Sequence, residues 1–209
     1  MLIAARNAIL ADGAALPYDA EVEYLESANA QYINTGVILS GDFSFDVKTI
    51  AAPYAEWGYY PGLMGCSESG IGDSYFRPNN VTYMQWRAYG VNNQDMRSNL
   101  LTTLHQYTMN VSDGYVSFYI DGTFIRRAAV TTKTYTVPVW LFSINKYPYA
   151  KYSGKIYGAK ITRGGVDAWD GIPVRVGSGS SAVGYMYDRV SGTLFGNAGT
   201  GAFVIGPDK

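Results

Sequence analysis

The stretch YTMNVSDGYVSFYIDG, residues 107–122, alternates apolar and polar side chains and contains the dipeptide Asp-Gly twice. A period of two places every second side chain on the same face of a β-strand. The side chains that share the buried face are Tyr107, Met109, Val111, Val116, Phe118 and Ile120. Asp121–Gly122 supplies two residues able to adopt positive φ in a tight turn. The stretch therefore predicts two half-buried strands and a hairpin that returns through residues 124–125.

The same texture of short alternating runs, separated by Gly, Asn, Asp and Pro, extends from Glu21 to the carboxyl end. Such runs are typical of β-sandwiches and barrels. Further strands are predicted at residues 23–37, 43–47, 62–66, 74–77, 83–89, 137–144, 154–162, 184–187 and 193–195. Ten or so strands with scarcely any helix imply an all-β sandwich of two packed antiparallel sheets.

The first twenty residues differ from the rest. Their larger apolar side chains recur at offsets of seven and eight, which favours one short amphipathic helix. These side chains are Leu2, Ile3, Ile9 and Leu10. We expect residues 1–20 to form a helix or arm that docks on a partner protein or on the chain's own sandwich. Residues 21–209 are expected to form one domain, the default for this length.

Composition narrows the range of partners. A formal charge of −1 from 16 basic and 17 acidic residues gives no broad attraction to phosphate backbones, which argues against nucleic acid. No stretch approaches the roughly 20 apolar residues needed to span a bilayer, so membrane insertion is not expected. Arg6 and Asn7 interrupt the apolar amino terminus, which does not resemble a secretory signal. A place on a virion or at a cell surface would need another route of export.

Two residue types occur once. Cys66 is the only cysteine, which excludes an intrachain disulfide, and we expect it to be a small buried side chain. His105 is the only histidine, which excludes a zinc site built on several His or Cys ligands. A Ser-His-Asp triad at His105 remains formally open, although an ordinary strand-end histidine is the favoured interpretation.

Several motifs resemble a single superfamily. The hairpin YVSFYIDGT (115–123), the strand WLFS (140–143) and the glycine-led strand YSGKIYGAKI (152–161) are similar to the laminin G-like branch of the concanavalin-like lectin and glucanase superfamily. Motifs nearer the two ends are similar to a subgroup common in gut bacteria and their bacteriophages. They are EYLES (23–27), QYINTG (31–36), GYMYD (184–188) and GNAGTG (196–201).

This resemblance covers about residues 21–206 and implies a two-sheet jelly roll. Its usual setting, appended to large surface or virion proteins, implies attachment. It does not imply an activity, because the same fold carries lectins, glycoside hydrolases and structural modules.

Catalysis would require paired carboxylates. Retaining glycosidases hold two carboxyl groups about 5–5.5 Å apart, and glucanases of this superfamily carry them as E-x-D-x-E on one strand. Glu21, Glu23 and Glu26 form the only comparable run, with Glu instead of Asp in the middle and a position at the start of the first strand. We expect solvated edge-strand charges here, and no enzyme.

Calcium is the one cofactor that the resemblance suggests, because some laminin G-like domains bind it through loop acids and carbonyls. Glu68, Asp73 and Asp95 are the loop acids nearest the predicted rim. They are scattered singly, which favours solvated turn residues, so no metal site is assigned and calcium is kept as an alternative.

The chain is rich in aromatic residues, with 19 Tyr, 8 Phe and 4 Trp. Sugar recognition combines an aromatic platform with nearby amides or hydroxyls. Three loop-flanking stretches have this composition. Their candidate ligand-binding residues are Trp57, Tyr59, Tyr60, Tyr89, Asn92, Asn93, Tyr147 and Tyr149. Trp86 and Trp140 lie within predicted strands, so we expect them in the core.

The favoured hypothesis is a non-catalytic carbohydrate-binding or receptor-recognition module on a bacteriophage particle or a gut bacterial surface. One alternative is a virion decoration or assembly protein that docks through residues 2–10 and uses the sandwich as a scaffold. Another is a glycoside hydrolase that uses Glu21 and Glu23. A homo-oligomer is compatible with each of these, since surface sandwich proteins often form closed assemblies.

Overall fold

The computed structural model describes residues 15–28, 30–51, 61–79, 83–95, 101–145 and 152–209. Within these ranges the chain consists of β-strands, connecting turns and one short 3-10 turn, Gly179–Ser181. None of the described residues belongs to a helix long and apolar enough to cross a membrane. The helix predicted for residues 2–10 falls outside the described ranges and stays a prediction.

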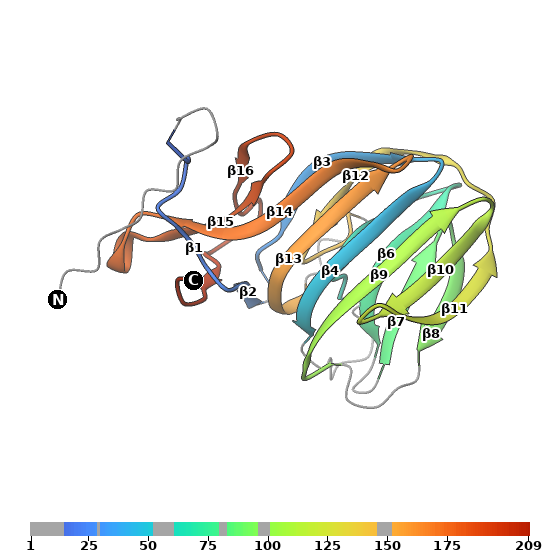
Figure 1. Ribbon diagram of the computed structural model, residues 1–209, viewed down its shortest axis with the longest axis horizontal. Coiled ribbons are helices and arrows are strands. Elements are labelled where there is room, and N and C mark those ends of the chain that lie inside the picture. Colours follow the sequence, from blue (N-terminus) through green and yellow to red (C-terminus); the bar gives the residue numbers. More distant parts are fainter. Residues whose placement is uncertain (1–14, 29, 52–60, 80–82, 96–100, 146–151) are drawn as a thin grey trace.

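The strands form two antiparallel sheets that pack face to face (Figure 1). The larger sheet contains, in spatial order, β11 (Thr123–Ala129), β10 (Tyr115–Ile120), β9 (Leu104–Ser112), β4 (Phe43–Ala51), β13 (Ser153–Arg163), β14 (Val166–Val176), β15 (Val183–Asp188) and β16 (Thr193–Phe195). Beside this path, β1 (Ala20–Glu21) pairs with β14, β2 (Leu25–Ala28) with β13, and β17 (Val204–Ile205) with β2.

The smaller sheet contains six strands. In spatial order they are β3 (Ile33–Ser40), β12 (Thr134–Leu141), β5 (Met64–Glu68), β6 (Gly72–Asn79), β7 (Tyr83–Ala88) and β8 (Val91–Asp95). The predicted fold class, an all-β sandwich of two antiparallel sheets, is confirmed.

Aromatic side chains from both sheets meet in the core. The ring of Phe118 lies 5.8 Å from that of Phe76 and 5.5 Å from that of Trp86 between ring centroids. The alternation predicted for residues 107–120 is confirmed, since all six inward side chains are at most 3% exposed. The turn that follows is confirmed as well, with φ of 50° at Asp121 and 74° at Gly122.

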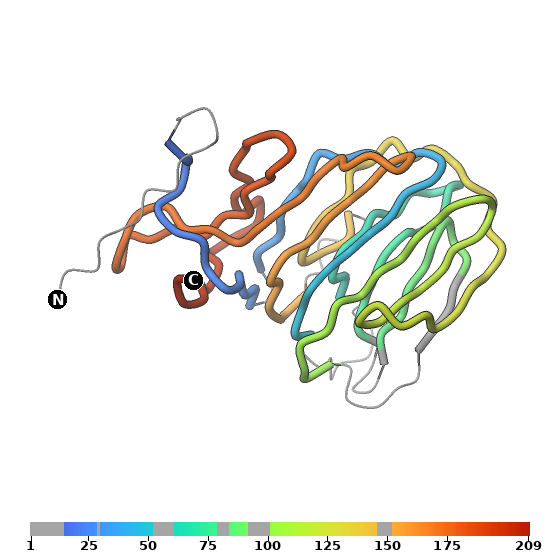
Figure 2. Tube along the Cα trace, viewed as in Figure 1, coloured from blue at the N-terminus to red at the C-terminus, as the bar shows by residue number. Residues whose placement is uncertain are grey.

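Strand β14 changes partners along its length. Its first half pairs with β13 up to Ala159–Gly171, and its second half pairs with β15 on one side and β1 on the other. The edge of β13 that β14 leaves is taken by β2, from Ser153–Ala28 to Ile156–Leu25. The far half of β14 thus leaves the sandwich and forms a small lobe with β1, β15 and β16, on the left of Figures 1 and 2.

Several sequence expectations differ from the structure: strands β1, β8, β14 and β17 were not predicted, and two of the differences have a local cause. The single strand predicted at 23–37 is two strands, because the side chain of Gln31 accepts the Ala28 N–H at 2.9 Å and holds a bend between them. Strand β14 was not predicted, because its Gly171 and Pro173 are residues typical of turns. Pro173 has no backbone N–H and joins the lobe through its carbonyl, which accepts the Val22 N–H at 3.0 Å.

We predict that Phe118→Ala lowers the free energy of unfolding by about 3–5 kcal/mol, because it empties a fully buried ring site shared by both sheets. Phe118→Leu should cost clearly less. Urea denaturation followed by tryptophan fluorescence measures both. Equal stability of Phe118→Ala and wild type would contradict this account of the core.

Gly171 and Gly158 provide a matched pair of variants that tests the packing where β14 leaves β13. A Cβ on Gly171 would overlap the ring of Trp169, whereas a Cβ on Gly158 would have its nearest neighbour, the Gly171 carbonyl oxygen, at 3.6 Å. We expect Gly171→Ala to cost about 1–3 kcal/mol of stability through overpacking. Gly158→Ala should stay within about 0.5 kcal/mol of wild type. Urea denaturation of the two variants measures both effects. A larger loss of stability in Gly158→Ala than in Gly171→Ala would refute this packing.

Candidate ligand-binding face

One row of side chains crosses the outer face of the larger sheet. Each member is the direct antiparallel partner of the next, so all of them project on the same side. We name these residues the outer row: Phe124 (β11), Tyr119 (β10), Thr108 (β9), Asp46 (β4), Lys160 (β13) and Asp170 (β14). The neighbouring residues Phe118, Phe45 and Trp169 point into the core, which fixes the outward direction of the row.

Aromatic side chains lie at the β11 end of the outer row. Phe124 is 54% exposed and meets Tyr119 edge to face, with 5.7 Å between ring centroids. A β-bulge at Ile125 shifts the register so that Phe124 and not Ile125 stands opposite Tyr119. On the same face, the Arg127 guanidinium stacks on Tyr115 at 3.7 Å from the ring centroid. This end therefore exposes apolar ring surface beside a cation.

The middle of the outer row is polar and charged. The Asp46 carboxylate accepts hydrogen bonds from the Thr108 hydroxyl and, at 3.5 Å, from the Gln106 amide. Lys160 Nζ lies 2.8 Å from the Asp167 carboxylate, and the hydrogen bond that it donates there raises the pKa of Lys160, although burial acts to lower it. Lys160 therefore stays cationic.

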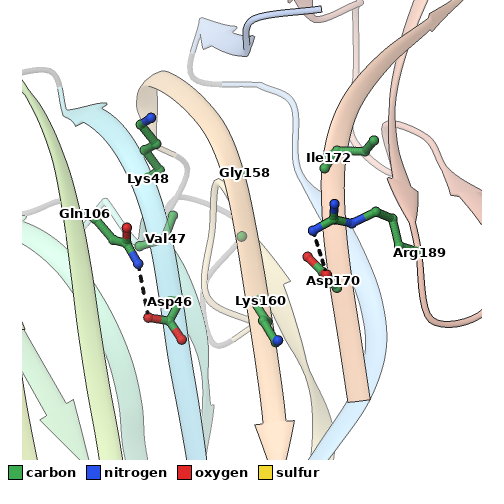
Figure 3. A pocket seen from close by; sticks show the side chains of 11 residues that line it. Asp46, Val47, Lys48, Gln106, Gly158, Lys160, Asp170, Ile172 and Arg189 are labelled. Atoms are coloured by element: carbon green, nitrogen blue, oxygen red, sulfur yellow. Dashed lines mark hydrogen bonds and ion pairs between the residues drawn. The ribbon is translucent and has the colours of Figure 1, made fainter. Parts of the chain in front are cut away.

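A groove of about 350 Å³ lies over this part of the row (Figure 3). Its floor is Gly158 and Gly171, at the point where the neighbour of β13 changes from β14 to β2. Since Gly158 has no side chain, the sheet is hollow there. Figure 3 shows Lys160 between the strands that carry Asp46 and Asp170, and Arg189 paired with Asp170 at 2.7 Å.

A second polar cluster lies on the outer face of the smaller sheet. The guanidinium groups of Arg77 and Arg87 lie 5.2 and 5.6 Å from the centroid of the Tyr75 ring, and Arg87 pairs with Asp73 at 2.6 Å. This cluster was not predicted from the sequence, where its signal is the alternation of Tyr75 and Arg77 along one strand. Tyr75 is 1% and Arg77 9% exposed, whereas the Arg87 side chain is 31% exposed, so the Tyr75 ring offers no stacking surface to a ligand in this structure.

Seven of the eight predicted ligand residues have side chains outside the described part of the structure. Those outside the described ranges are Trp57, Tyr59, Tyr60, Tyr147 and Tyr149. Asn92 and Asn93 lie in β8, where the structure describes the backbone and not the side chains. These seven stay predictions.

Tyr89 is described in full and lies in the core. Its ring stacks on Tyr135 at 5.4 Å, its hydroxyl donates to the Gly41 carbonyl at 2.7 Å, and burial raises its pKa to about 12. A φ of 49° turns this residue inward at the β7–β8 hairpin. Its ring therefore offers no ligand surface here. Trp86 is buried as expected, whereas Trp140 is only partly buried and stacks on Tyr32 at 4.4 Å.

The loop acids considered for calcium have protein partners. Glu68 accepts from the Thr136 N–H at 2.6 Å, and Asp73 accepts from Arg87. The Asp95 side chain lies outside the described part. Across the described residues, no three His, Cys, Asp or Glu side chains gather closely enough to hold a metal ion.

The acids considered for catalysis lie on or between the short strands β1 and β2 of the larger sheet. Glu21 is on β1, with its carboxylate 3.7 Å from Lys209 Nζ, and Glu26 on β2 lies 3.9 Å from Lys155 Nζ. Glu23 is exposed between these strands. None of the three lies on the outer row.

His105 lies in a hydroxyl–imidazole–carboxylate chain. Its Nε2 is 2.7 Å from the Thr103 hydroxyl and its Nδ1 is 2.7 Å from the Asp121 carboxylate, which also accepts the Gln106 N–H at 2.9 Å. Burial acts to raise the pKa of Asp121, but the hydrogen bonds from Gln106 and His105 together lower it below its ordinary value. These bonds tie the β10–β11 turn, next to Phe124, to the start of β9.

Comparison with known proteins identifies the architecture. No model of a known protein family and no curated protein matches the sequence. An inferred carbohydrate-binding protein from Bacteroides ovatus superposes with a TM-score of 0.61 at 11% identity, over 88% of this chain and 60% of that one. This chain has the concanavalin A-like jelly-roll fold.

Two further solved structures resemble this jelly roll. Domains LG4-5 of the mouse laminin α1 chain match with a TM-score of 0.49 at 11% identity, over 79% of the jelly-roll chain and 48% of the laminin chain. A Crh5 transglycosylase in complex with NAG matches with a TM-score of 0.43 at 13% identity, over 80% of this chain and 76% of the transglycosylase chain. The chain thus spans about three fifths of the bacterial protein and about half of the laminin fragment.

We predict that Asp121→Asn destabilises the protein at neutral pH and that this difference from wild type disappears in acid. Because the folded-state pKa of Asp121 is lowered, its contribution is present above the ordinary carboxyl range and is lost as the pH falls below about 4. Urea denaturation of both proteins at pH about 7 and about 3 measures the difference. A difference that grows on acidification would contradict this role of the Asp121 hydrogen bonds.

Proposed function

We propose that this jelly roll is a non-catalytic carbohydrate-binding module and that the outer row, with its groove, is the glycan-binding face. The observation that carries the proposal is the order of chemistry along the row: two aromatic rings at one end, then a hydroxyl, a carboxylate, an ammonium group and a second carboxylate on successive strands. The fold shared with the inferred carbohydrate-binding protein supports it.

The chemistry of a sugar fits this order. A pyranose ring has an apolar face of C–H groups, which stacks on an aromatic ring, and a rim of hydroxyls that donate and accept hydrogen bonds. The rings of Phe124 and Tyr119 can stack on the apolar face of the sugar. Hydroxyl and amide groups in the next row of the sheet can form hydrogen bonds with the sugar hydroxyls. They are Ser117, Asn110, Ser44 and Thr162.

The charges around the groove favour a neutral sugar. Three carboxylates and three cations line or flank the groove. They are Asp46, Asp167, Asp170, Lys48, Lys160 and Arg189. Because these charges balance, an anionic sugar would gain little from the field at the groove.

The biological setting is part of the proposal. We propose attachment to a virion or cell surface, on a bacteriophage particle or a gut bacterium, with residues 2–10 as the docking segment. This setting rests on the motifs at 23–36 and 184–201. If glycans do not bind, a virion decoration role with the sandwich as scaffold becomes the better hypothesis.

We predict that Tyr119→Ala and Phe124→Ala each lower the affinity for a neutral oligosaccharide about tenfold, the loss of roughly one aromatic stacking contact. Glycan-array screening of the wild type identifies the sugar, and calorimetry of the variants measures the loss. Val183→Ala removes an exposed apolar side chain of β15 off the row and is the matched control. Unchanged affinity in both aromatic variants would move the site elsewhere.

The non-catalytic part of the proposal has its own test. Wild-type protein incubated with the polysaccharide that it binds should release no reducing ends, and Glu23→Gln should bind like wild type, because Glu23 lies off the row. Product that accumulates with wild type and not with Glu23→Gln would support the glycoside hydrolase alternative.

A further inference from the structure

We infer that the ligand of this face is an extended neutral glycan chain that runs across the strands along the outer row, and not a single terminal sugar. This inference rests on the proposed function. It adds the length and the direction of the bound chain.

The first reason is the length of the row. Six adjacent strands carry it, and neighbouring strands lie about 4.8 Å apart, so its ends are about 24 Å apart. The aromatic pair lies on β11 and β10, and the groove extends from Gln106 on β9 to Asp170 on β14. Phe124 and Lys160 are four strands apart, about 19 Å, so no single sugar ring contacts both.

The second reason is the shape of the surface, which is open over the described residues of the row and does not form a deep pocket there. A site for one small molecule encloses most of the ligand surface. Here the residues in the next row, Ser44, Asn110 and Thr162, have short polar side chains, and Ser44 and Thr162 bond each other at 2.7 Å. Gly158 and the groove lie on the opposite side of the row from these residues, so short side chains flank the row on one side and an open groove flanks it on the other.

The third reason is that hydrogen bonds hold members of the row, or residues next to them, at three places. Asp46 is held by Thr108 and Asp170 by Arg189. The His105–Asp121 bond holds the turn beside Phe124. Groups already fixed in place lose little conformational freedom on binding, so each sugar added to the chain gains contacts at low entropic cost.

Chain length is therefore the decisive variable. An array that carries glucan, mannan, xylan and galactan ladders of one to six residues tests it with the full-length protein. We expect one series to bind, with affinity that rises at least tenfold from the disaccharide to the hexasaccharide. Binding of one series with equal affinity at all lengths would overturn this inference and leave the proposed function standing. No binding on any ladder would overturn both.

Variants at the two ends of the row test the direction. Phe124→Ala and Arg189→Ala alter opposite ends, so each should lower the ratio of hexasaccharide to disaccharide affinity several-fold in calorimetry. The double variant should lower it by the product of the two effects, since the sites are far apart. Val183→Ala should keep the wild-type ratio, and circular dichroism checks folding. A ratio unchanged in both end variants would refute a chain laid along the row.

Discussion

The register between β4 and β13 is the constraint on which both faces of this jelly roll depend. The two strands pair from Phe43–Arg163 to Ala51–Gly154, and they lie at the centre of the larger sheet. Because side chains alternate with a period of two, a slip by one residue would turn Phe45 outward and Asp46 into the core. Burial of Phe45 and Ile161 therefore also holds Asp46 and Lys160 on the surface. Core packing and the candidate binding face are two consequences of one pairing.

The change of partner by β14 has a comparable double effect. Trp169 fills the space over Gly171 on the inner side, and on the outer side Gly158 leaves the sheet without a side chain. The strand can then depart and pair with β15 and β1, which builds the lobe and opens the groove at the same place. Gly158, Gly171 and Trp169 thus lie both where β14 leaves the sandwich to form the lobe and where the groove opens on the outer row.

Similar chemistry has different consequences on the two sheets. Arg77, Arg87 and Tyr75 on the smaller sheet combine cations with an aromatic ring, as Arg127 and Tyr115 do on the larger one. Tyr75 is buried and Tyr115 is 42% exposed. Composition is therefore a poor guide to a binding face, whereas exposure and register identify one. The fold by itself names no ligand, because jelly rolls carry many activities.

Local patterns in the sequence were sufficient for most strands and for the Asp121–Gly122 turn, but not for β14. The alternation in residues 107–122 determined which side chains face the core, and Asp121–Gly122 determined the hairpin, since period and positive φ are properties of a few adjacent residues. Tyr89 shows the limit of that information. The aromatic and amide residues around it suit a sugar-binding platform, yet the β7–β8 turn directs its ring inward. Only the tertiary structure aligned residues 46, 108, 119, 124, 160 and 170, because strand order and register come from packing between distant segments and not from local preference.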